Sequence, residues 1–126
     1  MYKILIVDDS DTMRQILKNI IKEVPEISEI VERKNGLEGK NAVLEENFDL
    51  ILTDWNMPEV NGLEFVQYIK NSNSSNIART PVIMITTEGL KDQVITAIKA
   101  GVNDYIIKPF TQVEIQQKVK KLLNIK

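Results

Sequence analysis

The chain has 126 residues, 43% of them hydrophobic and 27% charged, with a formal net charge of −2. This composition is that of a globular chain of one domain, and the lack of a basic excess argues against binding to nucleic acid. Because cysteine and histidine are both absent, disulfides, thiolate catalysis and imidazole ligands are excluded, and any metal must be held by oxygen. No stretch has the pattern of a signal peptide or the roughly 18 apolar residues of a membrane helix, so we expect a cytoplasmic protein with one domain over residues 1–126.

Short apolar runs alternate along the chain with longer segments of helical periodicity. The apolar runs predict strands at residues 2–7, 27–32, 50–53, 82–85 and 104–107. Apolar residues at helical spacing predict helices around residues 13–24, 37–46, 61–69, 94–101 and 111–123. This (βα)5 order predicts a doubly wound α/β fold, in which right-handed crossovers join five parallel strands and helices cover both faces of the sheet.

Individual residues mark where these helices begin and end. Pro25 ends the first helix, because proline disfavours helical geometry in the residue before it. The second helix has the weakest pattern, since Gly39 costs about 1 kcal/mol relative to alanine. Asn61 followed by Glu64 predicts a capped start for the third helix, and Gly101 closes the fourth.

The later helices are recognised by their apolar residues and caps. The buried side of the third helix is predicted to consist of Leu63, Val66, Tyr68 and Ile69. The fourth helix is marked by Val94, Ile95, Ile98 and Val102. Thr111 and Glu114 predict a capping box at the start of the last helix. The polar residues 71–76 predict an exposed loop.

Charged residues follow three of the predicted strands. Asp8 and Asp9 follow the first strand, Asp54 the third and Lys108 the fifth. Since the carboxyl ends of parallel strands meet at one edge of the sheet, where ligands bind in open α/β folds, we expect these side chains to lie together. Three carboxylates on one edge repel each other and need a cation, and Mg²⁺ prefers such oxygen ligands together with a phosphate. A carboxylate in this setting can attack a phosphoryl group and form an aspartyl phosphate.

Four motifs stand in order at the predicted strand ends: Asp8-Asp9, Asp54-Trp55-Asn56-Met57-Pro58, Thr86 and Lys108-Pro109-Phe110. With these motifs the chain resembles the receiver domains of two-component response regulators, and most of all the single-domain chemotaxis regulators of that family, over essentially its whole length. The resemblance implies a flavodoxin-like sheet with strand order 2-1-3-4-5. It also implies a cis bond between Lys108 and Pro109 and the absence of an attached output domain.

The resemblance further implies the chemistry of the site. Asp54 is the expected phosphoacceptor and Mg²⁺ the expected cofactor. Asp9 and Asp54 would ligate the ion directly, while Asp8 would act through a water molecule and Asn56 through its backbone carbonyl. Lys108 would pair with Asp54 before transfer and with the phosphoryl oxygens after it.

Other residues are implied to pass the signal on. Thr86 would donate its hydroxyl to the phosphoryl group, and Tyr105 would move between exposed and buried rotamers in response. Lys91, Tyr105 and Lys118 match positions at which such regulators contact their partners. These three residues are therefore the expected partner-binding residues.

Residues beside the site are implied to tune its chemistry. Asn56 and Glu88 match positions that control autodephosphorylation in the family, and both agree with the chemotaxis type. Thr87 stands where the family usually has alanine or glycine, so we expect narrower access to Asp54. Asn61 replaces a common aspartate, which changes the helix cap and little else.

The resemblance implies a monomeric signalling domain and not an enzyme, with intrinsic self-phosphorylation and autodephosphorylation. Its expected partners are a histidine kinase as phosphodonor, the flagellar motor switch protein as target, and a dedicated phosphatase. Neither nucleic acid nor a membrane is expected to bind it.

Three alternatives remain open at this point. A metal-dependent phosphatase would need a second carboxyl group where Asn56 stands. A flavodoxin would need a hydroxyl-rich phosphate loop in place of the acidic segment 8–11. A stand-alone phosphorelay receiver would share the chemistry of the leading hypothesis but would pass its phosphate to a histidine phosphotransfer protein.

Overall fold

The computed structural model describes residues 1–125, and its strands and helices follow the predicted order with one additional short helix. The strands are β1 (Tyr2–Val7), β2 (Ile27–Arg33), β3 (Leu50–Thr53), β4 (Val82–Thr86) and β5 (Asp104–Ile107). The helices are α1 (Asp11–Ile21), α2 (Gly36–Glu45), α3 (Gly62–Lys70), α4 (Ser75–Ala78), α5 (Lys91–Ala100) and α6 (Gln112–Leu122). Every predicted strand is present, within one residue of its expected ends.

The strands form one parallel sheet in the order β2-β1-β3-β4-β5, which confirms the predicted fold class. Val7, the last residue of β1, pairs with Thr53, the last residue of β3. Thr86 of β4 pairs in the same way with Ile107 of β5. The residues that follow these strands therefore all start from the carboxyl edge of the sheet.

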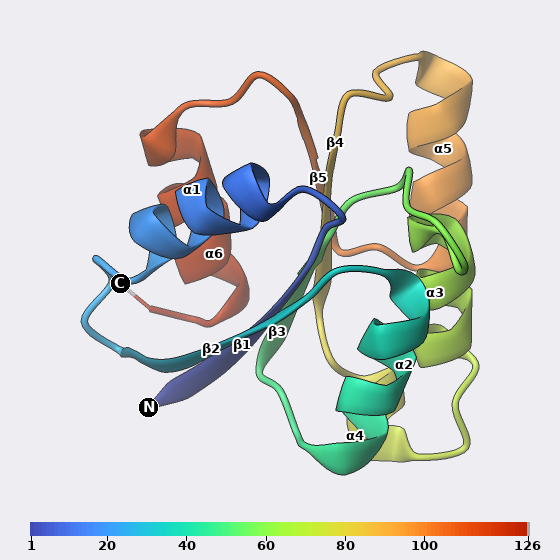
Figure 1. Cartoon of the computed structure of the whole chain (residues 1–126), viewed down its shortest axis with the longest axis horizontal. Helices are drawn as coiled ribbons and strands as arrows, with labels where there is room; N and C mark the ends of the chain where they lie inside the picture. The colour runs from blue at the N-terminus through green and yellow to red at the C-terminus, as the bar shows by residue number, and fades with distance from the viewer. Residues whose placement is uncertain (126) are drawn as a thin grey trace.

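Side chains of the central strands alternate between two apolar cores. In β1, Leu5 and Val7 face the core that contains Phe65 of α3. Ile4 and Ile6 face the opposite core. Helices α2, α3 and α5 cover the first face of the sheet, and α1 and α6 cover the second (Figure 1). Because both faces of the sheet are covered, the central strands are apolar at nearly every position, as parallel sheets require.

The ends of two helices differ from the prediction. Helix α1 ends at Ile21, three residues before Val24, which lies beyond the helix and is nevertheless buried. Pro25 constrains only Val24, and between Ile21 and Val24 the chain forms a turn in which the Val24 N–H donates to the Ile21 carbonyl oxygen at 3.1 Å. At the start of α6 the Glu114 N–H donates to Thr111 Oγ1 at 3.1 Å, which is one of the two bonds of the predicted capping box.

The buried side of α3 was predicted only in part. Val66 and Ile69 are fully buried as expected, but the third buried apolar residue is Phe65. Leu63 and Tyr68 are only partly buried. Tyr68 nevertheless packs against the core, so the prediction failed at Leu63 and missed Phe65. Helical spacing allows neighbouring stripes of apolar residues, and packing against the sheet selects one of them.

The chain between α3 and β5 also departs from the prediction. Residues 71–76 are not wholly a loop, because the helix α4 begins within them. Helix α5 buries Ala97, whereas Ile95 and Ile98 are 39% and 56% exposed. Gly101 closes α5 as predicted, with the left-handed φ of 114° that favours glycine.

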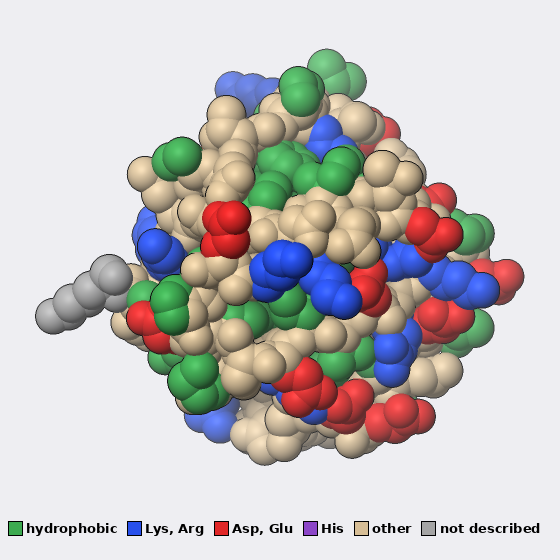
Figure 2. Space-filling model, turned by 60° about the vertical axis from the view of Figure 1, so that its left-hand side comes forward, with side chains coloured by type: hydrophobic (Ala, Val, Ile, Leu, Met, Phe, Trp, Pro, Cys, Tyr) green, Lys and Arg blue, Asp and Glu red, His purple; other side chains and the backbone are tan. Residues whose placement is uncertain are grey.

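Charges of both signs are mixed on the surface. Figure 2 turns the side of α1 and α6 toward the viewer and shows Lys and Arg side chains beside Asp and Glu. Arg14 and Lys18 of α1 each lie 3.5 Å from Glu32 of β2. The pair of Lys18 is the more exposed of the two, and such surface pairs contribute at most about 1 kcal/mol. Within residues 1–125, no helix combines the length and apolar character needed to cross a membrane.

Gly62 allows α3 to start directly against the segment that follows β3. A Cβ atom at this position would come within 1.9 Å of the Asp54 carbonyl oxygen. The Gly62 N–H donates to the Trp55 carbonyl oxygen at 2.7 Å. The missing side chain thus determines how closely the helix approaches the backbone that carries Asp54.

We expect Gly62→Ala to lower the free energy of unfolding by about 2 kcal/mol or more, because the added methyl group must displace backbone atoms. Gly89→Ala is the matched control, since a Cβ there would meet only side-chain atoms of Ile107, at 3.4 Å or more. Urea denaturation followed by circular dichroism measures both variants. Equal stability of the two would contradict the packing argument.

Candidate functional site

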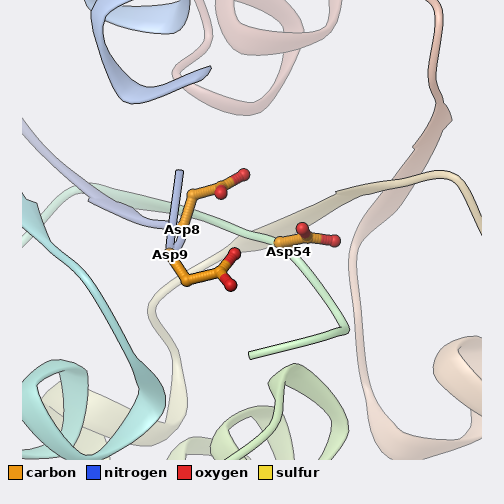
Figure 3. Close-up of side chains that lie close together, drawn as sticks. All are labelled: Asp8, Asp9 and Asp54. Carbon is orange, nitrogen blue, oxygen red and sulfur yellow. The ribbon is translucent and has the colours of Figure 1, made fainter. Parts of the chain in front are cut away.

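Three carboxylates come together at the carboxyl edge of the sheet. Asp8 and Asp9 follow β1, and Asp54 follows β3, where its N–H donates to the Val7 carbonyl oxygen at 3.0 Å. One oxygen from each carboxylate lies within 4.8 Å of the others. Figure 3 shows the three side chains extending to the same side of the strand ends. Such a set of hard oxygen donors fits a Mg²⁺ ion.

Asp8 is the most buried of the three, with 2% of its surface exposed. Its Oδ1 accepts a hydrogen bond from the Ser10 N–H at 2.8 Å, and its Oδ2 lies 3.3 Å from Lys108 Nζ. Burial raises the pKa of Asp8 above its ordinary value, although Ser10 and Lys108 act in the opposite direction. Its ionised form is therefore unfavourable in the metal-free protein, and a bound cation would stabilise it.

The carboxylate of Asp54 is oriented by different partners at its two oxygens. The Trp55 N–H donates to Oδ1 at 2.6 Å, and Lys108 Nζ lies 3.2 Å from Oδ2. The backbone is held as well, since Thr53 Oγ1 donates to the Asp54 carbonyl oxygen at 2.9 Å. Asp54 is 9% exposed, so it is a fixed carboxylate that solvent still reaches.

Lys108 enters the site from the turn after β5. Its N–H donates to the Thr86 carbonyl oxygen at 2.8 Å, and its bond to Pro109 is cis, as predicted. Its ammonium lies between Asp8 and Asp54. This position lets Lys108 offset part of the negative charge that the carboxylates bring together.

A second set of contacts centres on Glu88, in the loop between β4 and α5. Asn56 Nδ2 donates to Glu88 Oε1 at 2.8 Å. Thr86 Oγ1 accepts a bond from the Glu88 N–H at 3.3 Å, and the Tyr105 hydroxyl donates to the Glu88 carbonyl oxygen. Burial, assisted by the charges of Glu88 and Asp54, raises the pKa of Tyr105 to about 12, so its hydroxyl remains a donor at neutral pH.

Three predicted site residues belong neither to the carboxylate centre with Lys108 nor to the contacts around Glu88. Thr87 and Lys91 are exposed, and Lys91 is the first residue of α5. Lys118 of α6 donates to Asp104 Oδ1 and to the Tyr105 carbonyl oxygen, both at 3.1 Å. A partner that contacts Lys118 would therefore compete with these two bonds.

Gln93 belongs to the site and was not predicted. Its Nε2 donates to Glu88 Oε2 at 2.6 Å. The available sequence signal is its position three residues after Leu90, where glutamine can form half of a capping box. Leu90 has no polar side chain to form the other half, so the signal is weak.

The whole chain, and not only the site, is similar to proteins of one kind. Residues 4–120 match the response regulator receiver domain family. The chain is 46% identical over 123 residues to the chemotaxis protein CheY1 of Helicobacter pylori, and the match covers 96% of each chain. It is 43% identical over 122 residues to the chemotaxis protein CheY homolog of Campylobacter jejuni, covering 96% of this chain and 92% of the relative.

Comparison of the folds agrees with the comparison of the sequences. The solved structure of the chemotaxis response regulator CheY4 of Vibrio cholerae matches with a TM-score of 0.86 at 28% identity, covering 97% of this chain and 98% of that one. The residues of the site described above, from Asp8 to Lys118, all lie within the segment 4–120 that matches the family. The chain therefore belongs to the response regulator receiver domain family, and it resembles CheY chemotaxis proteins over nearly its full length.

Proposed function

We propose that this chain acts as a single receiver domain over residues 1–126 that accepts a phosphoryl group on Asp54 from a histidine kinase. The observation that carries the proposal is the convergence of three carboxylates and Lys108 on one point, with Asp54 already oriented there. Its resemblance to proteins named for chemotaxis supports CheY-type control of the flagellar motor as the outcome.

Mg²⁺ is the proposed cofactor, since the chain has neither cysteine nor histidine and offers oxygen ligands at the site. Asp9 and Asp54 would hold the ion directly, Asp8 through a water molecule, and Asn56 through its backbone carbonyl. When bound, the ion offsets negative charge on the oxygens of the transferring phosphoryl group.

In the transfer step an oxygen of Asp54 attacks the phosphorus atom of the donor. The new bond joins that oxygen to phosphorus, while the bond from phosphorus to the donor histidine breaks and leaves its electron pair on the imidazole. Lys108, 3.2 Å from Asp54 Oδ2, remains paired as charge moves onto the phosphoryl oxygens. Thr86 uses its oxygen to accept from Glu88, so its hydroxyl hydrogen can donate to a phosphoryl oxygen.

The signal leaves the site through Thr86 and Tyr105, which both bond to the backbone of Glu88. The output face is formed by α5, β5 and α6, and Lys91, Tyr105 and Lys118 lie on it. The large exposed apolar residues of these elements and of the cap of α5 are Leu90, Ile95, Ile98, Ile107 and Val113. If this face has an inactive and an active conformation, shifting their populations from 99:1 to 1:99 would require the phosphoryl group to stabilise the active one by about 5.5 kcal/mol more than the inactive one.

The proposed partners rest on the similarity to chemotaxis proteins of the receiver family. The histidine kinase supplies the phosphoryl group, the flagellar motor switch protein binds the output face, and a dedicated phosphatase removes the group. The protein works as a cytoplasmic monomer whose output is contact with other proteins. Its self-phosphorylation and autodephosphorylation both take place at Asp54.

Phosphorylation can be tested with acetyl phosphate as the donor. In the presence of Mg²⁺ the wild-type protein should gain the mass of one phosphoryl group, because Asp54 is an oriented nucleophile beside Lys108. Asp54→Asn, and wild type in EDTA, should gain none. Intact-mass spectrometry measures the change, and fluorescence of the adjacent Trp55 follows it in solution.

The matched control for this experiment is Asp92→Asn, which removes an exposed carboxyl group from the first turn of α5. This variant should be phosphorylated like the wild type. A phosphoryl group on Asp54→Asn, or none on the wild type, would refute Asp54 as the acceptor.

Asp8→Asn should stabilise the metal-free protein and weaken Mg²⁺ binding. Burial raises the pKa of Asp8 in the folded protein. The contribution of Asp8 to the free energy of unfolding therefore falls as the pH rises from the ordinary carboxyl pKa through the raised pKa. Above that interval the variant should have a higher free energy of unfolding than the wild type, because it carries no buried charge at this position. Asparagine can still accept the bond from Ser10.

Thermal unfolding in EDTA and in Mg²⁺ tests both parts of this expectation. In EDTA at neutral pH the variant should have the higher Tm, and the difference should shrink as the buffer is acidified. Mg²⁺ should raise the Tm of the wild type more than that of the variant, since binding stabilises by mass action. A variant that is less stable in EDTA at neutral pH would show that ionised Asp8 is not unfavourable.

A further inference from the structure

Glu88 is held at four of its atoms by four different residues. Its N–H donates to Thr86, and its carbonyl oxygen accepts from Tyr105. Its two carboxylate oxygens accept separate bonds, Oε1 from Asn56 at 2.8 Å and Oε2 from Gln93 at 2.6 Å. The side chain therefore forms a bridge between the loop after β3 and the first turn of α5.

Gln93 provides the helix end of this bridge, and its side chain has two separate tasks. Its Nε2 donates to Glu88, while its Oε1 accepts the Leu90 N–H at 3.2 Å and so caps the start of α5. The cap fixes the side chain on the helix, which leaves the amide nitrogen aimed at Glu88. Because the Gln93 side chain is already ordered by the cap, it loses little conformational entropy when its amide nitrogen binds the Glu88 carboxylate.

The other end of the bridge is less well supported. Asn56 is exposed, and in the part of the chain that the structure describes its side-chain nitrogen bonds to Glu88. Without Gln93, the carboxylate of Glu88 would keep only the bond from the exposed Asn56 amide. A water molecule could readily replace that amide as the donor. The position of the Glu88 carboxylate next to Asn56 thus depends on the bond that Gln93 of α5 donates.

We propose that Gln93 is a positioning residue that holds the Glu88–Asn56 bridge beside Asp54 and thereby slows hydrolysis of the phosphoryl group. The inference rests on the proposed phosphorylation of Asp54 and concerns its lifetime. In hydrolysis a water oxygen bonds to phosphorus, the bond between phosphorus and the Asp54 oxygen breaks, and the electron pair returns to the carboxylate. Inorganic phosphate leaves, and a proton of the water passes to solvent.

The bridge slows this step by restricting the approach of water. The closed bridge joins Asn56, two residues after Asp54, to Glu88, two residues after Thr86, so it borders the site on one side, and both carboxylate oxygens of Glu88 are satisfied in it. When the bond from Gln93 is lost, the Glu88 side chain can turn toward solvent and open this side to water. The phosphoryl group on Asp54 then has a shorter lifetime.

Two substitutions of Gln93 separate its two tasks. Gln93→Glu keeps an oxygen that can accept the Leu90 N–H, but it removes the donor to Glu88 and adds a like charge. Gln93→Met keeps the approximate length of the side chain and removes both bonds. Each protein is phosphorylated with acetyl phosphate and Mg²⁺, the donor is removed, and the loss of the phosphoryl mass is followed over time.

We expect Gln93→Glu and Gln93→Met each to increase the rate of autodephosphorylation by about threefold or more, a factor that corresponds to the lower end of the coupling free energies between residues in contact. In a Glu88→Ala background, where no bridge can form, the same substitutions should leave the rate unchanged. Urea denaturation should show Gln93→Glu folded with near wild-type stability, because its cap remains. A merely structural role for Gln93 would not produce this dependence on Glu88.

The dephosphorylation rates of the variants distinguish a positioning role of Gln93 from a role in the helix cap alone. Unchanged or slower dephosphorylation in Gln93→Glu would overturn the inference, and so would an equal acceleration with and without Glu88. Acceleration in Gln93→Met alone would assign Gln93 to the cap and also overturn it. If the wild type takes up no phosphoryl group, the proposed function fails and the inference with it, whereas normal uptake with equal lifetimes defeats the inference alone.

Discussion

Electrostatic repulsion among Asp8, Asp9 and Asp54 is the constraint on which the rest of the site depends. Two like charges about 4 Å apart repel by roughly 4 kcal/mol at an effective dielectric constant near 20. The pairing of β1 with β3 keeps these carboxylates close, and Lys108 offsets only part of their charge. Burial of Asp8, with a smaller contribution from the nearby charge of Asp54, disfavours its ionised form in the metal-free fold, whereas a divalent cation would favour it. Stability and cation affinity are therefore opposed at this site.

Glu88 connects this charged centre to the surface. Its backbone contacts Thr86 and Tyr105, and its carboxylate contacts Asn56 and Gln93. Helix α5 contributes little to the core, so its first turn depends more on such hydrogen bonds than on apolar packing. A change at the proposed phosphoryl site can therefore reach α5 without disturbing the sheet, because this helix buries only Ala97 in the core.

The sequence predicted the sheet and the charged centre well, because both follow from a general rule. Apolar runs identify parallel strands, and the residues after them must meet at one edge, which located Asp8, Asp54 and Lys108 together. Propensity alone was a poorer guide to α2. Gly39 weakens that helix locally, yet a Cβ there would lie 2.9 Å from Phe65, so its absence lets α2 pack on α3. Tertiary packing of this kind is invisible in a local window.

Helix α5 shows the opposite limit of sequence analysis. Ile95 and Ile98 have the spacing of a buried face, but periodicity does not distinguish side chains covered by the sheet from side chains left for a partner, and both are exposed. Gln93 was overlooked for a related reason, because its bond to Glu88 runs from the helix to the preceding loop and leaves no periodic pattern in the sequence. Ile95, Ile98 and Gln93 thus lie on the helix that the proposed signal would move, and a functional surface is one place where local rules of burial are expected to fail.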